Sequence, residues 1–438
     1  MRVRDRLGAL TEREFRLLWL GQSVSGLGDA MALVALAFAV LGIAGARGAS
    51  DLGFVMTAWV ISRTALTLVG GVWADRLPRQ WVMVGSDLTR ALAQAAVAVL
   101  VVTRVARIWE LVVLVVVYGA ADAFFHPAET GLVPATVSAA RLQQANALMG
   151  LSRNTVALIG PALSGLIVAA FGPGWVFAVD AASFLVSALF LTRLRVPAMQ
   201  RGVEQASLLA ELRDGWRQVI TRSWVWASIV YFAVVNAATT AIFVLGPVVA
   251  VRSFGGARAW GIVGSAATAG SILGGLAAVR LKPRRLLLGG TLALATIALE
   301  PALLARPFPV VVIAAAAMVG FAGVSFNTAL WYTALQEQVP EQVLSRVSAY
   351  DWMGSFVVQP AGFAVVGPLA ASLGLGPTLR LSAILVAGSS AAILLVPSVR
   401  RLERVEAEPE ESSKASKAGA PVPGLAEAGG HVADDGAR

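Results

Sequence analysis

The chain has 438 residues, of which 57% are hydrophobic and 14% are charged, and its mean hydropathy is +0.73. These values exclude an ordinary soluble domain, in which about 25% of residues are charged, and favour a membrane protein. The lack of cysteine excludes disulfides and thiolate metal sites, and the two histidines, His126 and His431, lie too far apart in the sequence to suggest metal chemistry.

Twelve apolar segments predict an all-α membrane protein with two pseudo-symmetric bundles of six transmembrane helices. A bilayer core of about 30 Å needs about 20 apolar residues per helix. The first set lies at roughly 15–41, 53–74, 81–102, 109–126, 143–171 and 175–192. The second set lies at roughly 224–250, 259–281, 286–305, 309–333, 344–373 and 378–397. The first segment is too long for a signal-peptide core, so we interpret it as a retained helix.

These segments divide the chain into four parts. They are an N-terminal bundle (1–192), a cytoplasmic linker (193–223), a C-terminal bundle (224–398) and a tail (399–438). The second half of the linker has apolar residues at helical spacing, which predicts an amphipathic helix along the membrane surface. The tail is charged and rich in alanine, glycine and proline, which predicts disorder.

The basic residues predict the orientation of the helices. If the N-terminus lies in the cytoplasm, most of the 35 lysines and arginines fall in inner segments and few in outer loops. Because such residues collect on the cytoplasmic side, both termini are expected there. The excess of arginine over lysine is typical of GC-rich bacterial genomes, which suggests a bacterial plasma membrane. The net charge of +9 is then a signal of topology and not of a nucleic-acid surface.

The first predicted helix carries an acid near its middle, Asp29. A charge at mid-span costs about 2.5–3.5 kcal/mol, so it should face a cavity or a partner. Asp29 can therefore carry a proton or contact a bound molecule. The alternative is a fixed ion pair with an arginine such as Arg63, mid-way along the second helix, and the sequence leaves both open.

The second helix ends in the stretch GGVWADRLPRQ, with the charged residues Asp75, Arg76 and Arg79. The two arginines anchor a cytoplasmic loop. Asp75 can accept hydrogen bonds from the N-terminus of a neighbouring helix, where the dipole favours an anion, and so hold the cytoplasmic side closed. The alternative is that it only neutralises an arginine. The corresponding stretch of the second half, GGLAAVRLKPRR, has Val279 in place of the acid.

Four charged residues away from the ends of the third, fourth and fifth predicted helices are also candidates. Asp87 and Arg90 are three residues apart and share a helix face, which favours a structural ion pair. Asp122 and Arg153 lie toward the cytoplasmic halves of their helices. They pair with each other or line an inner vestibule, and the sequence does not decide between these interpretations.

Five other polar residues of the predicted helices are three acids, for which we predict structural roles, and two asparagines, whose roles stay open. Asp180, Glu300 and Asp351 are read as lying nearer to helix ends, where hydration makes a charge inexpensive, so we predict structural roles for them. Asn236 and Asn327 can hydrogen-bond a substrate, but hydrogen bonds between packed helices are at least as frequent.

Three sequence echoes indicate that the two bundles are repeats. Gly71 corresponds to Gly275, the stretch LVPATVSAARLQ to QVPEQVLSRVSA, and GPALSGLIVAAFG to QPAGFAVVGPLAASLG. The offset is nearly constant. Such repeats are typical of secondary transporters, whose substrate path lies near the midplane where the repeats meet.

The sequence resembles the major facilitator superfamily. The superfamily's motif after the second helix, Gly-x-x-x-Asp-Arg-x-x-Arg, stands here as Gly71, Asp75, Arg76 and Arg79. More narrowly, stretches such as FRLLWLGQSVSGLGDAM, FFHPAETGLVPATVSAARLQQANALMG and TALQEQVPEQVLSRVSAY resemble bacterial exporters of the macrolide-efflux and enterobactin-exporter type. These stretches come from both halves, so the resemblance covers nearly the whole chain apart from the tail.

The resemblance implies a proton-driven exporter that works by alternating access, of the kind associated with multidrug resistance. Gly160, Pro161 and Gly165 match the antiporter motif of the fifth helix, where small residues also allow close helix packing. The motif after the second helix is implied to be a gate. Many drug/proton antiporters have an arginine in the fourth helix, whereas the stretch WELVVLVVVYGAADAFF has none, so a relay through it is not carried over.

We therefore expect a monomer that exports an amphipathic antibiotic, siderophore or secondary metabolite in exchange for protons. Its expected partners are this small molecule, protons and the lipid bilayer, with no cofactor and no nucleic acid. An importer or a lipid flippase on the same fold is the alternative, because fold does not fix function, and a non-transporting receptor or scaffold is less favoured. We find no nucleophile–base set or phosphate loop, so an enzyme is not expected.

Overall fold

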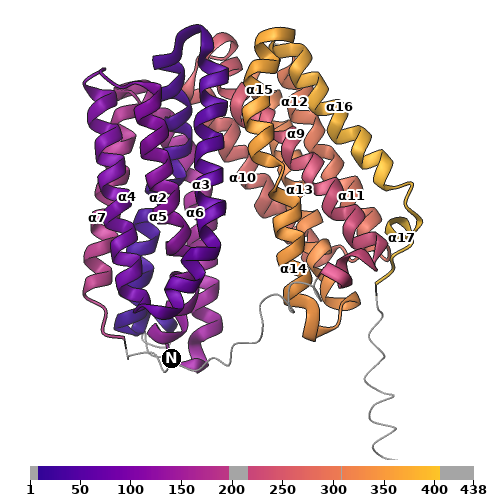
Figure 1. The fold of residues 1–438 in the computed structure, drawn as a ribbon, viewed down its shortest axis with the longest axis horizontal. Coiled ribbons are helices and arrows are strands. Elements are labelled where there is room, and N and C mark those ends of the chain that lie inside the picture. Colours follow the sequence, from indigo (N-terminus) through magenta and orange to yellow (C-terminus); the bar gives the residue numbers. More distant parts are fainter. Residues whose placement is uncertain (1–7, 197–215, 307, 405–438) are drawn as a thin grey trace, which may run out of the picture. The chain divides into compact units, whose positions relative to one another are not determined.

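The computed structural model describes residues 8–196, 216–306 and 308–404, without the side chains of residues 67–76 and a few single positions. In this part of the chain the protein is built of helices (Figure 1), and the isolated β-bridge that is present joins Arg285 and Glu403. The predicted all-α membrane fold is confirmed. Most of the predicted tail (399–438) and most of the predicted linker helix lie outside the described residues.

The first half contains six long helices. They are α2 (Arg13–Ala44), α3 (Gly48–Arg76), α4 (Arg79–Val102), α5 (Ile108–Leu132), α6 (Leu142–Phe171) and α7 (Pro173–Thr192). The predicted ranges agree with these bounds to within a few residues, except that α5 continues well past its predicted end at 126. The predicted end is wrong because the helix continues through polar residues beyond 126, and one of these, Glu129, lies on a helix face that lines a cavity.

The second half repeats this order with two interruptions. Its helices are α9 (Ser223–Ser253), α10 (Ala257–Arg280), α11 (Leu286–Ala295), α12 (Leu299–Leu304), α13 (Val310–Gln338), α14 (Glu341–Phe356), α15 (Gln359–Leu373) and α16 (Leu375–Ile393). A 3-10 turn at Thr296–Ala298 separates α11 from α12, and Pro301 then lacks the N–H that would continue the α-helical pattern. Similarly, Pro360 lies at the start of α15, where proline is well tolerated.

Among the described residues, eleven helical stretches are long and apolar enough to cross a membrane. Large apolar side chains also point away from the protein along these helices: Leu92 is 73% exposed and Val311 is 78% exposed. Exposed apolar surface on this scale fits contact with lipid and not with water. Length, composition and surface therefore all support a multi-pass membrane protein.

The turns that precede the last helix of each half support the internal repeat. Gly172 lies between α6 and α7, with φ 91° and ψ 165°, and Gly374 lies between α15 and α16, with φ 92° and ψ 161°. Positive φ values of this kind are readily adopted only by glycine. Two equivalent positions in the two halves thus use the same residue in the same backbone conformation.

The small residues of α6 allow close packing on two sides. A Cβ atom built on Gly160 would lie 2.5 Å from the Cβ of Ala30 in α2, and one built on Gly165 would lie 2.5 Å from the carbonyl oxygen of Ala257 in α10. The second contact joins the two halves, as does the hydrogen bond of 3.1 Å that Thr57 donates to the carbonyl of Pro360. The predicted role of these glycines in packing agrees with this geometry.

We expect Gly165→Leu to destabilise the protein, because the new side chain would collide with the backbone of α10. Overpacking of this kind typically costs about 1–3 kcal/mol. Gly150→Leu, on the same helix, is the matched control, since a Cβ atom there meets no other atom within 4 Å. Thermal unfolding in detergent compares the two variants. Equal unfolding temperatures would show that the contact of α6 with α10 does not limit stability.

Candidate functional site

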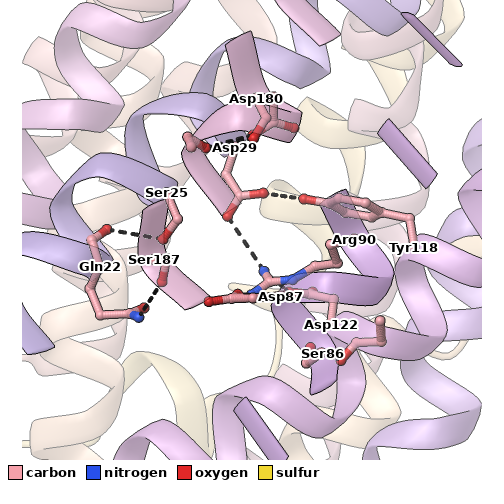
Figure 2. Close-up of polar contacts among 12 residues, drawn as sticks. Gln22, Ser25, Asp29, Ser86, Asp87, Arg90, Tyr118, Asp122, Asp180 and Ser187 are labelled. Carbon is pink, nitrogen blue, oxygen red and sulfur yellow. Dashed lines mark hydrogen bonds and ion pairs between the residues drawn. The ribbon is translucent and has the colours of Figure 1, made fainter. Parts of the chain in front are cut away.

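Arg90 of α4 is the centre of a buried cluster of charges (Figure 2). Its Nη2 atom lies 2.5 Å from Oδ1 of Asp87, one turn earlier on the same helix. Its Nη1 atom lies 3.4 Å from Oδ1 of Asp122 in α5 and 3.7 Å from Oδ2 of Asp29 in α2. The predicted pair of Asp87 and Arg90 is present, and Asp29 and Asp122, which were predicted as separate residues, lie in the same cluster.

Two aromatic rings complete the surroundings of Arg90. The guanidinium carbon lies 4.1 Å from the ring centre of Phe125 in α5 and 4.3 Å from that of Phe184 in α7. A desolvated cation over an aromatic face gains about 2 kcal/mol or more. The acids and the rings together compensate the cost of burying this arginine, and they tie α4 to three neighbouring helices.

Asp29 is the acid of this cluster that is most open to its surroundings. Its side chain is 35% exposed, and its Oδ1 atom accepts a hydrogen bond from the hydroxyl group of Tyr118 in α5 (Figure 2). Asp29 therefore has two partners, Arg90 and Tyr118, and remains accessible from a cavity that it lines. An acid in this position can exchange a proton without leaving the cluster.

The cavity has a volume of about 490 Å³ and lies within the first half. Arg63 of α3 reaches it, with Nε 3.1 Å from Oδ2 of Asp122 and the guanidinium 6.0 Å from the ring centre of Trp59. Other residues of its lining include Gln22, Ser23, Leu33, Leu36, Gln94, Tyr118, Phe125, Met149, Ser152, Val156, Ala157, Pro161 and Phe177. Polar groups on one part of the wall and apolar side chains on the rest suit an amphipathic ligand.

A row of charged side chains continues from Arg90 along α5. His126 places Nε2 3.6 Å from Oδ1 of Asp122 and Nδ1 3.6 Å from Oε2 of Glu129. Arg153 of α6 places Nη1 3.7 Å from Oε1 of Glu129. Asp122 and Arg153 thus both line the cavity but do not share a partner. Asp122 lies against Arg63, Arg90 and His126, whereas Arg153 lies against Glu129.

Tyr118, His126 and Glu129 were not predicted as site residues. The signal was present in their spacing, because residues 118, 122, 126 and 129 follow one another at intervals of four, four and three and so share one face of a helix. Reading the fourth helix as ending at 126 placed Glu129 in a loop. His126 lay at the end of that prediction and was weighed only as a metal ligand.

Three acids that we expected near hydrated helix ends are buried instead. Asp180 accepts a hydrogen bond of 2.5 Å from the side chain of Gln94, and Asp351 accepts one of 2.8 Å from the indole of Trp331. Glu300 is also buried, in the short helix α12. The expectation was wrong because packing against neighbouring helices, and not the distance to a helix end, decides whether a side chain meets water.

The second half has a smaller cavity of about 390 Å³ with a different lining. Asn236 and Asn327 both line it, and Asn236 donates a hydrogen bond of 2.9 Å to the carbonyl of Ser355. Its other lining residues include Phe232, Phe321, Trp331, Tyr332, Asp351, Trp352 and Phe356. This wall is aromatic and carries one acid, whereas the wall in the first half carries acids and arginines.

The predicted gate after the second helix is described only in part. Helix α3 runs to Arg76, but the side chains of Gly71, Asp75 and Arg76 lie outside the described residues. Arg79 begins α4. The next residue, Gln80, donates hydrogen bonds of 2.8 and 3.1 Å to the carbonyls of Leu191 and Leu194, which fasten the start of α4 to the end of α7.

The chain matches known transporters over most of its length. The family model of the Major Facilitator Superfamily matches residues 18–363. The multidrug efflux pump Tap of Mycolicibacterium fortuitum is 28% identical, with 88% of this chain and 96% of that protein covered. The macrolide efflux protein A of Streptococcus pyogenes is 20% identical, with 89% and 97% covered, and the enterobactin exporter EntS of Salmonella typhimurium is 28% identical, with 70% and 74% covered.

Two solved transporters have the same fold. A bacterial homologue of the human lysosomal transporter Spinster superposes with a TM-score of 0.70 at 12% identity, covering 90% of this chain and 98% of that one. The nucleoside transporter NupG superposes with a TM-score of 0.67 at 14% identity, covering 89% and 99%. At such low identity these structures define the fold and leave the substrate open.

Proposed function

This chain belongs to the Major Facilitator Superfamily, and we propose that it is a proton-coupled exporter of amphipathic small molecules. Membership of the family makes it a multi-pass membrane transporter and not an enzyme, as the sequence predicted. The narrower resemblance to macrolide-efflux and enterobactin-exporter proteins is also confirmed by the relatives. The direction of transport, the coupling to protons and the kind of substrate are our proposal.

Export is supported by the relatives and by α6. A multidrug efflux pump, a macrolide efflux protein and an enterobactin exporter all align with most of this chain. In addition, Gly160, Pro161 and Gly165 match the antiporter motif and pack α6 closely against α2 and α10. Small residues at these contacts let two helices slide and rock against each other, which an alternating-access cycle needs.

The observation that carries the proton coupling is the position of Asp29. Its carboxylate is open to the cavity yet lies 3.7 Å from the buried guanidinium of Arg90. Protonation would remove its charge and with it the attraction between α2 and α4. Asp87 and Asp122 would then be the remaining charged partners of Arg90 in this cluster. Protonation of Asp29 can in this way weaken the attraction between α2 and α4. Because Asp29 lines the cavity, the same change can occur while a substrate is bound there.

The remaining parts of the proposal concern orientation and gating. We place both termini in the cytoplasm of a bacterial cell, from the distribution of the basic residues, and take the working unit to be a monomer. We assign the cytoplasmic gate to Gly71, Asp75, Arg76 and Arg79. Asp75 has no acidic counterpart in the second half, so the two halves would contribute unequally to this gate.

Transport by purified protein in liposomes tests the proposal. Erythromycin, the cationic dye rhodamine 6G and the anionic dye carboxyfluorescein serve as amphipathic probes, and liposomes without protein serve as the control for passive partition. At least one probe is expected to accumulate against its gradient when a pH gradient drives protons the opposite way. A protonophore should abolish this accumulation.

The other outcomes distinguish the alternatives. Accumulation of a probe together with the proton would make the protein an importer. Accumulation that ignores the pH gradient would remove the coupling to protons. Movement of fluorescent lipids between leaflets, without movement of any probe, would favour a flippase.

A further inference from the structure

The charged side chains that line the cavity of the first half differ in their exposure. The side chains of Arg153, His126 and Arg63 are 64%, 54% and 44% exposed. The side chains of the acids beside them are nearly buried, at 9% for Asp122 and 10% for Glu129. A molecule that enters this part of the cavity therefore meets the basic groups first.

We propose that His126 and Arg153 form an anion-binding subsite, so that organic anions are the preferred substrates. This inference rests on the proposed transport function and names its substrate class. The two residues come from α5 and α6 and approach the same acid, Glu129, from two sides. They therefore lie close together at one wall of the cavity.

Both residues keep hydrogen-bond donors for a ligand. The distances to Glu129, 3.6 Å from His126 and 3.7 Å from Arg153, exceed the usual range of about 2.7–3.2 Å for a hydrogen bond. Among the described residues neither side chain donates a hydrogen bond. A guanidinium has five N–H groups, and an imidazole has at least one in any protonation state. The nearby acid thus orients two donors electrostatically without occupying them.

The chemistry of these donors selects the anion. The fork of an arginine matches a carboxylate or a similar planar anion with two parallel hydrogen bonds, and such charge-assisted bonds are about twice as strong as neutral ones. His126 lies against the other carboxylate oxygen of Glu129, close enough to Arg153 to contact the same ligand. A carboxylate or phenolate group on the substrate could accept hydrogen bonds from both Arg153 and His126.

The rest of the substrate should be apolar. Val156, Ala157 and Pro161 also line the cavity and follow Arg153 on α6 at intervals of three, four and eight residues, which places them on the same helix face. Leu33 of α2 also lines the cavity. An anionic head at Arg153 and an apolar body along α6 together describe an amphipathic organic anion.

A cationic substrate would have to bind elsewhere in the cavity. The most exposed acid in the lining is Asp29, at 35%, and it already lies against Arg90 and Tyr118. The side chains of Arg153, His126 and Arg63 are all more exposed than that of Asp29. The observations therefore favour an anion, and binding of a cation instead becomes an outcome of the test.

Dye binding to the purified full chain in detergent tests the subsite apart from transport. Carboxyfluorescein and rhodamine 6G share a ring system but carry opposite charge, and fluorescence anisotropy gives the dissociation constant of each. We expect tighter binding of carboxyfluorescein. Arg153→Gln and His126→Gln should each weaken it roughly tenfold and leave rhodamine 6G unchanged. Arg280→Gln, an exposed arginine at the end of α10 that does not line the cavity, is the matched control and should change neither constant.

Several results would overturn the inference. Tighter binding of rhodamine 6G would do so, as would equal loss of both dyes in the two variants or no binding of carboxyfluorescein to the wild type. Elution of each variant as a single peak from a sizing column shows that a loss is not caused by unfolding. Anion binding without pH-driven transport would instead refute the proposed function and leave the subsite standing.

Discussion

Replacing Arg90 with glutamine is expected to destabilise the protein more than any other single change in the charge cluster. The variant would leave Asp87, which is fully buried, without the cation that lies 2.5 Å away, and Asp122 would lose one of its two arginines. Removing one partner of a buried ion pair typically costs about 3–5 kcal/mol. The lost contacts with the rings of Phe125 and Phe184 add to this cost.

The double variant Arg90→Met with Asp87→Asn separates charge from packing. It removes both partners of the closest pair and keeps an apolar side chain between the two rings, so it should recover part of the stability that Arg90→Gln loses. The fraction of protein that stays monodisperse in detergent after heating measures both. Wild-type stability of Arg90→Gln would mean that the arginine is not needed to hold the helices together.

The fold followed from the sequence more completely than the site did. Apolar runs and the charged residues between them placed the long helices, because the bilayer imposes a length on each. The break between α11 and α12 was missed, although Pro301 was visible, because the apolar pattern continues through it. The break between α14 and α15 at Pro360 was missed for the same reason.

The site could be predicted only as separate residues. The spacing of Asp87 and Arg90 on one helix was enough to pair them, since their distance depends on helix geometry alone. The meeting of Arg90 with Asp29 and Asp122 depends on how three helices pack, and one sequence contains no measure of that. The contact of Tyr118 with Asp29 illustrates the same limit. Spacing along α5 groups Tyr118 with Asp122, His126 and Glu129, but it does not show that α2 brings a carboxylate to the tyrosine.

The two halves share a repeat but differ in the chemistry of their cavities. Gly172 and Gly374 adopt the same backbone conformation at equivalent turns, so the two halves share this element of backbone structure. Among the described residues, the arginines of the first cavity have no counterpart in the lining of the second. The acid of the second cavity, Asp351, accepts hydrogen bonds from the neutral donors Trp331 and Ser355. We infer that coupling belongs to the first half and that the second half offers mainly aromatic surface.

Asp29→Asn is expected to abolish pH-driven transport and leave the protein folded. Asparagine has nearly the same shape and can still accept the hydrogen bond from Tyr118, while Arg90 keeps Asp87 and Asp122 as partners. What it loses is the group that can bind and release a proton. Accumulation driven by a pH gradient should fall to the rate of liposomes without protein. Exchange of labelled for unlabelled substrate at equal pH should persist, because exchange needs no net movement of protons.

The matched control is Asp51→Asn, which removes an acid from the first turn of α3, outside the cavity lining. It should lose no more than the small interaction of an acid with a helix N-terminus, about 0.3–1 kcal/mol, and should transport normally. If Asp29→Asn retained full accumulation, Asp29 would be a structural partner of Arg90 and the proton would have to bind elsewhere. Of the other acids in the lining, Asp122 and Glu129 lie against basic side chains, so the row along α5 would be the next place to look.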